Sequence, residues 1–238
     1  MTTILFDSHI HFQEADELKN SGVDYFACCG IDSCDWFRVK KQAEINRKIV
    51  PFYGLHPWYV EEERGDWREI LEQLVRENKC GIGETGLDTF RDISLSKQVE
   101  VFKFHLELCL KYQRPIVIHM VKAFEKTLEF LKEYKPDSGV MIHAYSGSSE
   151  MVKEFNKLGV YFSLGGFFIK KSKEKKSNIL ENIPQNRLLV ETDSPTKEGL
   201  KLKNVIADIA DLKQKSFDEI AEISGQNALT FFKNVMEK

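Results

Sequence analysis

Short β-prone apolar runs alternate with longer helical stretches along the whole chain, and this alternation limits the possible folds more than any other feature. The apolar runs are residues 4–8, 23–30, 49–54, 80–84, 115–119, 139–143, 159–164 and 188–192. The predicted helices are residues 32–46, 66–77, 94–112, 124–134, 149–158, 201–213 and 216–234. This pattern predicts a parallel sheet, either a closed (β/α)8 barrel or an open doubly wound sheet.

Polar side chains that can bind metal ions stand near the ends of these runs. They are His9, His11, His56, Glu84, His119, His143 and Asp193. The C-terminal ends of barrel strands converge on one mouth, whereas outer strands of an open sheet end too far apart to meet. No Gly-x-Gly-x-x-Gly follows the first run, so the usual mark of a dinucleotide fold is absent. We predict one domain over residues 1–238, an α/β (β/α)8 TIM barrel with a metal site at its C-terminal mouth.

The first run ends in a His-x-His pair. Residues two apart on a strand point to the same face, so His9 and His11 can direct both imidazoles into one space. Imidazole is a common ligand of Zn, Fe, Ni and Cu. Asp7 shares this face and can ligate or orient, and the alternative for the pair is a polar strand end facing solvent. Only His105 lies inside a predicted helix, and we interpret it as a surface or packing residue.

Composition excludes several classes of protein. The net charge of −3 argues against a globally basic nucleic-acid binder, so a polyanion would be met by a local patch or by metal ions. The five cysteines are odd in number and include no Cys-x-x-Cys, which predicts reduced, mostly buried thiols and a cytoplasmic protein. We expect no signal peptide, because the N-terminus has no basic region and only a brief apolar run at residues 4–6. We expect no membrane association, because no apolar stretch approaches about 20 residues. We also expect a monomer.

Seven stretches, in order along nearly the whole chain, resemble the TatD-type metal-dependent deoxyribonucleases, within the metal-dependent hydrolases built on TIM barrels. The stretches are 7–11 (DSHIH), 54–57 (GLHP), 83–88 (GETGLD), 115–119 (PIVIH), 143–147 (HAYSG), 162–166 (FSLGG) and 189–195 (LVETDSP). Residues 223–231 are similar to the last helix of that family.

The resemblance implies a dinuclear metal centre. Its ligands would be His9, His11, Glu84, His119, His143 and Asp193, with Glu84 bridging two divalent ions. Mixed histidine and carboxylate ligands suit Mg, Mn, Zn, Co or Ni without selecting one. Such a metal pair activates water and neutralises charge on a phosphoryl group. Asp193 would hold or deprotonate this water, so Glu84 and Asp193 are the predicted catalytic carboxylates.

The remaining predicted residues concern the substrate. By the resemblance, His56 faces the substrate pocket. A packing or capping role is its alternative, and Asp88 is expected either to orient a ligand or to lie on the surface. Lysines after the seventh and eighth runs would attract phosphate, or else line a solvated helix face. Tyr145, Phe167 and Phe168 would stack on bases or pack in the core. We assign substrate binding to His56, Lys122, Ser146, Gly165, Gly166, Lys170 and Lys171, and note further lysines at 173, 175, 176, 197, 201 and 203.

The chain departs from the family pattern at two points. After the histidine of the fifth run the family usually carries Ser-Arg, whereas this chain has Met120-Val121 with Lys122 adjacent. After Thr-Asp-Ser-Pro the family usually has Tyr, and here Thr196 follows. The resemblance implies cleavage of phosphodiester bonds in single-stranded DNA or at DNA ends, by 3′–5′ exonuclease action. The alternative is that the same centre hydrolyses a small phosphate ester, lactone or cyclic amide. A non-enzymatic interaction module would predict missing ligands, yet all six are present.

Overall fold

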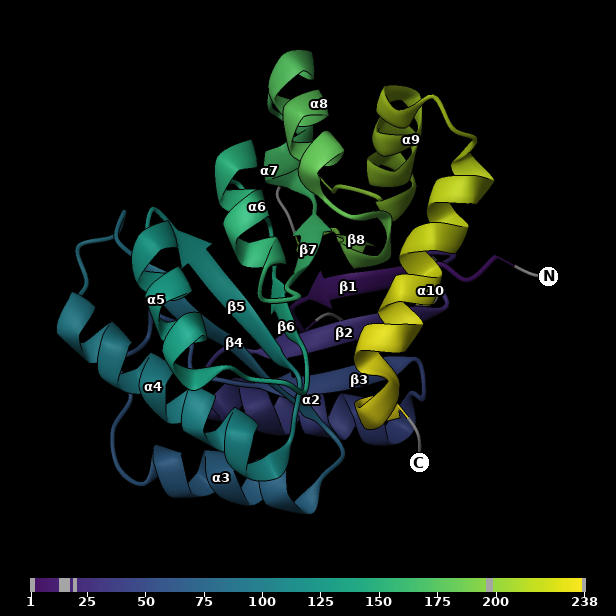
Figure 1. Cartoon of the computed structure of the whole chain (residues 1–238). Helices are drawn as coiled ribbons and strands as arrows, with labels where there is room; N and C mark the ends of the chain where they lie inside the picture. Colours follow the sequence, from purple (N-terminus) through teal and green to yellow (C-terminus); the bar gives the residue numbers. More distant parts are fainter. Residues whose placement is uncertain (1–2, 13–17, 19–20, 196–198, 237–238) are drawn as a thin grey trace.

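The computed structural model describes residues 3–12, 18, 21–195 and 199–236. Eight parallel strands lie in one sheet in sequence order, with helices packed around them (Figure 1). The sheet curves until its first and last strands meet. There, the backbone N–H of Asp193 donates to the His9 carbonyl at 3.0 Å, and that of His11 donates to the Ser194 carbonyl at 2.7 Å. The predicted (β/α)8 barrel is therefore confirmed.

The elements follow the predicted alternation. The strands are β1 Phe6–Ile10, β2 Tyr25–Gly30, β3 Ile49–Tyr53, β4 Gly81–Asp88, β5 Ile116–Val121, β6 Val140–Ile142, β7 Tyr161–Leu164 and β8 Leu188–Val190. The helices are α2 Ser33–Ile45, α3 Trp67–Glu77, α4 Leu95–Tyr112, α5 Phe124–Tyr134, α6 Ser149–Asn156, α7 Gly166–Ile169, α8 Lys173–Asn182, α9 Leu202–Lys213 and α10 Phe217–Met236, with a 3-10 turn at Gln185–Arg187. Among the described residues, no helix is both long and apolar enough to cross a membrane.

Local side-chain chemistry explains where the helices begin. Asp32 is the N-cap of α2, and its carboxylate accepts from the Asp35 N–H at 2.8 Å. Ser216 and Glu219 form a reciprocal capping box at the start of α10, with bonds of 3.2 and 2.8 Å. All five thiols are free, and only Cys34 is exposed, which agrees with the expectation of mostly buried cysteines.

Helix α8 was not predicted as an element, because its first turn carries several lysines that oppose the helix dipole. Two interactions offset this cost. The Ser172 hydroxyl accepts from the Lys175 N–H at the N-cap. The Lys176 ammonium lies 2.6 and 2.8 Å from the two carboxylate oxygens of Asp208 on α9. This pair joins two helices of the outer layer and ties up one of the lysines considered for phosphate binding.

The two ends of the barrel interior differ in polarity. At the N-terminal end of the strands, aromatic and aliphatic side chains form a buried cluster that α10 covers. Phe232 of α10 stacks on Phe6 with ring centroids 4.7 Å apart and meets Phe52 edge-on at 5.6 Å. The C-terminal end holds buried histidine and carboxylate side chains instead. A barrel with a packed base and a polar mouth places its chemistry at the mouth.

Candidate metal centre

The barrel brings all six predicted metal ligands to one place at the C-terminal mouth. His9 lies on β1 and His11 directly follows it, whereas Glu84 lies within β4 because that strand continues to Asp88 instead of ending at Glu84. His119 lies on β5, and His143 and Asp193 follow β6 and β8. The predicted role of each residue as a ligand stays a proposal, but their convergence is a feature of the fold.

The two oxygens of the Glu84 carboxylate face different histidines. Its Oε2 lies 3.2 Å from His9 Nε2 and 3.5 Å from His11 Nε2. Its Oε1 lies 2.7 Å from both His119 Nδ1 and His143 Nε2. Glu84 is 1% exposed, so its charge is compensated by these side chains and not by bulk water. A carboxylate placed in this way can bridge two cations.

Close strand pairing brings the second histidine pair to Glu84. Gly86 on β4 pairs with His119 on β5. A Cβ at Gly86 would lie only 2.0 Å from the His119 carbonyl oxygen, and the φ of Gly86 is +145°. Only glycine permits this approach and this backbone conformation. The Gly-Glu-Thr-Gly stretch therefore sets the distance between Glu84 and His119.

Asp193 completes the side of the site that opens to solvent. Its Oδ1 lies 3.3 Å from His11 Nε2 and 3.7 Å from His9 Nε2. Asp193 adopts a left-handed conformation with φ of +58°, which directs its side chain back over β1. The side chains of Asp193 and His11 are 28% and 26% exposed, whereas those of His9 and Glu84 are at most 1% exposed. Solvent therefore reaches the centre past Asp193 and His11.

Outer carboxylates orient two of the histidines. Asp88 Oδ2 lies 3.4 Å from His119 Nε2, and Asp88 is buried, so of its two expected roles the structure favours orientation. Glu191 Oε1 lies 3.4 Å from His143 Nδ1 and accepts from the Ala144 N–H at 2.7 Å. Such partners fix the ring orientation of ligand histidines. Sequence reasoning missed Glu191, although its spacing of two from Asp193 was a usable signal.

Asp7 stabilises the contact between β1 and the segment that follows β8, and its side chain does not reach the metal centre. Its carboxylate accepts from the Thr192 N–H at 2.9 Å and from the Thr192 hydroxyl at 2.7 Å. Burial raises the pKa of Asp7 to about 8, against the lowering effect of those hydrogen bonds. This contact ties β1 to the chain just before Asp193.

Mutual charge compensation dominates the electrostatics of the centre. Burial alone would raise the pKa of Glu84, but the surrounding histidines hold it well below its usual value. Burial also opposes the charged forms of Asp193 and His11. Their mutual hydrogen bond nevertheless sets the pKa of Asp193 at about 2 and raises that of His11 to about 9. The carboxylates thus remain ionised and available to cations.

The residues present fit divalent metal ions. His9 Nε2 and Glu84 Oε2 are buried and have no hydrogen-bond partner among the described residues, although they face each other at 3.2 Å. Burial lowers the pKa of His9, so its ring is neutral. A neutral imidazole nitrogen and a carboxylate oxygen directed at one space form a typical cation site. Ligand atoms within 4.8 Å of one another form three groups, which are His9–His143–Asp193, His9–His11–Glu84 and His56–Glu84–His119.

His56 lies beside the second histidine pair. Its Nε2 is 3.3 Å from Glu84 Oε1 and 3.2 Å from His119 Nδ1, and its Nδ1 accepts from the Trp58 N–H at 3.1 Å. The ring proton therefore sits on Nε2 and points into the site. His105 supports this loop from α4, because its Nε2 accepts from the Leu55 N–H at 3.0 Å. His105 is fully buried, which matches the packing role that the sequence suggested.

Some of the predicted substrate-binding residues lie close together in the structure, whereas others lie apart. The Lys171 ammonium donates to the Ser146 carbonyl at 3.0 Å, so these two lie together beside β6 and β7. Gly165 packs against Glu191, where a Cβ would lie 2.9 Å from Cγ, whereas Gly166 has more space. Lys170 follows α7 and is exposed. Lys122 follows β5 and rests on the Phe90 ring at 4.5 Å.

The other candidate residues have different positions. Tyr145 and Phe168 are buried in the core, whereas Phe167 is 61% exposed. Lys203 lies near Gly22, which precedes β2, and lines a second cavity together with Thr192 and Ser194. Lys197 and Thr196 lie outside the described residues.

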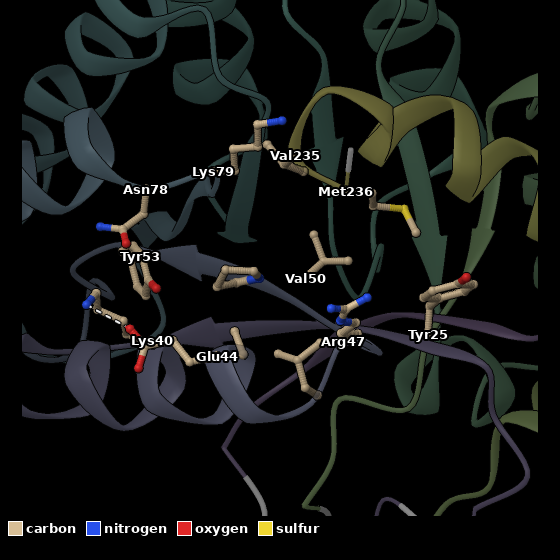
Figure 2. A pocket seen from close by; sticks show the side chains of 13 residues that line it. Tyr25, Lys40, Glu44, Arg47, Val50, Tyr53, Asn78, Lys79, Val235 and Met236 are labelled. Atoms are coloured by element: carbon tan, nitrogen blue, oxygen red, sulfur yellow. Dashed lines mark hydrogen bonds and ion pairs between the residues drawn. The ribbon is translucent and has the colours of Figure 1, made fainter. Parts of the chain in front are cut away.

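A cavity of about 400 Å³ lies at the opposite end of the barrel (Figure 2). It is lined by residues at the starts of β2 and β3 and by the end of α10. Its Lys40 is already bonded to Glu44 at 2.9 Å. None of its described lining residues has a buried polar side-chain atom without a partner. We therefore locate the chemistry at the mouth and not in this cavity.

Comparisons with known proteins agree with this geometry. Residues 6–233 match the family described as TatD related DNase. The uncharacterized metal-dependent hydrolase YabD of Bacillus subtilis is 31% identical over 253 residues, which covers 97% of this chain and 99% of YabD. The crystal structure of YjjV, a TatD homolog from Escherichia coli K12, superposes with a TM-score of 0.87 at 25% identity, covering 96% and 98% of the two chains. A TatD family hydrolase from Entamoeba histolytica shares the fold, with a TM-score of 0.85 at 17% identity and coverage of 97% and 98%. The chain belongs to the TatD-related DNase family of metal-dependent hydrolases, which act on ester bonds.

Proposed function

We propose that this protein is a nuclease that binds two divalent cations and shortens single-stranded DNA from its 3′ end. The observation that carries the proposal is the division of Glu84 between two histidine pairs. One cation would be held by His9, His11, Glu84 and Asp193, and the other by Glu84, His119 and His143. Bound there, the cations would supply Lewis acidity and a water molecule that loses a proton near neutral pH.

The protein side chains have separate tasks in this proposal. Asp193 is ionised and solvent-accessible, so its carboxylate can orient the attacking water and accept its proton. His56 presents an Nε2–H group to the site, and burial lowers its pKa to about 4, so it stays neutral. We assign it a hydrogen bond to a non-bridging phosphate oxygen. Water adds to phosphorus while the bond from phosphorus to the 3′ oxygen of the preceding nucleotide breaks. That oxygen takes a proton from solvent, which leaves a shortened strand with a 3′-hydroxyl and a nucleotide with a 5′-phosphate.

Strand ends suit this site better than duplex interiors. The net charge is −3, and the deepest ligand, His9, is fully buried within the barrel. A long duplex needs a broad basic surface, whereas a flexible single-stranded end can enter a recessed site. The family description as DNases supports DNA as the substrate class.

The test uses metal-stripped protein and a 5′-labelled single-stranded DNA oligomer, with Mg, Mn or Zn added back separately. We expect a ladder of 3′-shortened products that requires a metal ion and is lost in Asp193→Asn. A circular single strand of similar composition should stay intact, because it has no end. Calorimetric titration of metal into the protein gives a second readout, the number of cations bound.

Two results would contradict the proposal. If metal binds but the oligomer stays whole, the nuclease function is wrong, and small phosphate esters, lactones and cyclic amides become the substrates to test. If the circular strand is cut as fast as the linear one, cleavage is endonucleolytic and the end-directed part of the proposal is wrong. An RNA oligomer of the same sequence measures the preference for DNA.

A further inference from the structure

An arginine that the sequence analysis did not single out lies one aromatic ring away from the metal centre. The Arg91 guanidinium rests on the Trp58 indole, with Cζ 4.1 Å from the ring centroid. The Trp58 ring in turn lies 6.0 Å from the His119 ring and 4.9 Å from the His56 ring, edge-on to both. Arg91 belongs to the loop after β4, so it reaches this place from a different part of the barrel than Trp58 does.

One buried carboxylate holds this arrangement together. Asp88 Oδ2 accepts from the Trp58 indole N–H at 2.7 Å and also lies 3.4 Å from His119 Nε2. Asp88 Oδ1 accepts from the backbone N–H groups of Phe90 and Arg91 at 2.8 and 3.3 Å. Asp88 is 2% exposed, so it is shielded from competing water. The indole ring and the Arg91 loop therefore have fixed positions relative to the centre.

A second cation lies beside the first in the same manner. The Lys122 ammonium sits 4.5 Å from the centroid of the Phe90 ring, and Phe90 is 68% exposed. The Thr89 hydroxyl donates to the Lys122 carbonyl at 2.7 Å, which links the loop after β4 to the end of β5. Two exposed cations are thus supported by two aromatic rings on one side of the mouth.

These two cations differ in their partners from Lys171 and Lys176, which lie near or on α8. Within the described ranges, neither Arg91 nor Lys122 forms an ion pair with a carboxylate, and each makes its side-chain contact with a ring. By contrast, Lys176 is paired with Asp208 and Lys171 donates to the Ser146 carbonyl. A guanidinium lying over an aromatic ring keeps its N–H edges free for a second ligand. Arg91 and Lys122, on the side of the mouth near β4 and β5, can therefore bind an anion without losing an ion-pair partner.

We propose that Arg91 and Lys122 bind phosphates of the DNA strand next to the bond that is cleaved, so that the strand crosses the mouth over β4 and β5. This inference rests on the proposed nuclease function. The planar guanidinium fork matches two phosphate oxygens at once, whereas the lysine acts as a point charge. Trp58 is then a positioning residue, because its ring holds Arg91 at a fixed height above the site.

The experiment measures DNA binding separately from cleavage. In an Asp193→Asn background, which removes cleavage, fluorescence anisotropy gives the Kd for a 5′-labelled single-stranded oligomer at several salt concentrations. Adding Arg91→Ala should raise the Kd about tenfold, because a charge-assisted contact with one phosphate is lost. It should also lower the slope of log Kd against log salt by about 0.7, the value for one phosphate contact on a single strand. Lys122→Ala should give a smaller increase in Kd and a similar change of slope.

Two further variants separate the stacked geometry from charge alone. Arg91→Lys keeps the charge and should retain the salt slope while binding several-fold more weakly, because the bidentate fork is lost. Arg187→Ala is the matched control. It removes a partly buried arginine that also rests on an aromatic ring, 4.6 Å from the centroid of Tyr161, but at the opposite end of the barrel. We expect the control to bind DNA as the parent does, and thermal unfolding verifies that each variant is folded.

Each outcome supports or contradicts the inference. If Arg91→Ala binds the oligomer within twofold of the parent and keeps its salt slope, the inference is wrong even though the nuclease function stands. If Arg187→Ala weakens binding as much as Arg91→Ala, the effect is one of net charge, and the inference is again wrong. If the wild-type protein neither binds nor cleaves single-stranded DNA, the proposed function itself fails and the inference fails with it. Kinetics in the active protein give an independent measure, because Arg91→Ala should raise the KM for the oligomer more than it lowers kcat.

Discussion

The two ends of this barrel are built on the same eight strands with opposite kinds of side chain. At the N-terminal end, Phe6, Phe52 and Phe232 form stacked and edge-on contacts that exclude water. At the C-terminal mouth, His9 and Glu84 are equally buried, but their atoms His9 Nε2 and Glu84 Oε2 have no hydrogen-bond partner among the described residues. Packing at the N-terminal end thus stabilises the fold. At the mouth, buried polar atoms without hydrogen-bond partners remain available to bind cations, and their burial lowers stability.

The base and the mouth should therefore respond differently to substitution. A change at the mouth should abolish activity and leave folding largely intact. A change at the base should weaken folding and leave the chemistry of the folded molecules unaltered. The three predictions that follow test this separation.

The largest effect is expected for Glu84→Gln. The amide keeps the shape of the side chain but removes the charge that lies between both histidine pairs. We expect DNA hydrolysis to fall at least about 10³-fold, the upper scale for removing one electrostatic stabiliser from an active site, and the number of bound cations to decrease. Metal titration and cleavage rates measure these outcomes. Glu222→Gln, the same change at an exposed position of α10, should behave as wild type, and normal metal binding by Glu84→Gln would exclude a bridging role.

The next effect concerns the base. Phe232→Ala removes a fully buried ring that contacts Phe6, Phe52 and Phe231. We expect the free energy of unfolding to fall by about 3–5 kcal/mol, as for other buried Phe→Ala changes, with kcat per folded molecule unchanged. Urea denaturation and cleavage rates at low temperature measure the two quantities. Phe232→Leu offers a milder version if the alanine variant does not fold, and a parallel loss of kcat in that variant would show that the two ends are coupled.

Simple geometric rules were enough to predict from the sequence which histidines meet at the mouth. The convergence of His9, His11, His119 and His143 follows from strand periodicity and from the way barrel strands end. These rules need only spacing and order along the chain, so no contact had to be known in advance. The same rules predicted the alternation of strands and helices and most of their boundaries.

The supporting contacts were not predictable because they depend on rotamers and long-range packing. Nothing in the spacing of Trp58, Asp88 and Arg91 reveals that one carboxylate joins an indole ring, a loop and a histidine. The extension of β4 to Asp88 was missed because Gly83 and Gly86 suggest a turn, whereas here they allow close strand packing. Helix α8 was missed because the lysines in its first turn oppose the helix dipole. An N-cap and an ion pair with α9 offset this unfavourable interaction, and the ion pair cannot be read from the sequence.

The smallest effect separates a structural histidine from those at the mouth. Burial lowers the pKa of His105 to about 4 from an ordinary value of 6.5. Its Nδ1–H donates to the Val101 carbonyl at 2.7 Å and its Nε2 accepts from the Leu55 N–H, so a second ring proton would oppose that N–H. The folded state thus favours neutral His105. Its stability contribution is complete above pH 6.5 and is lost as the pH falls towards 4, by about 1.4 kcal/mol at pH 5.5.

His105→Gln provides both an acceptor and a donor but does not titrate in this range. We expect the free energy of unfolding to fall less between pH 7.5 and 5.5 in this variant than in wild type, with a difference of about 1.4 kcal/mol. Urea denaturation at the two pH values measures it, and weaker metal binding in acid affects both proteins alike, so it cancels in the comparison. Equal pH dependence in the two proteins would contradict a neutral, purely structural His105. The expected difference would mean that low pH destabilises this barrel partly by protonating His105, which is buried between α4 and the strands, independently of the histidines at the mouth.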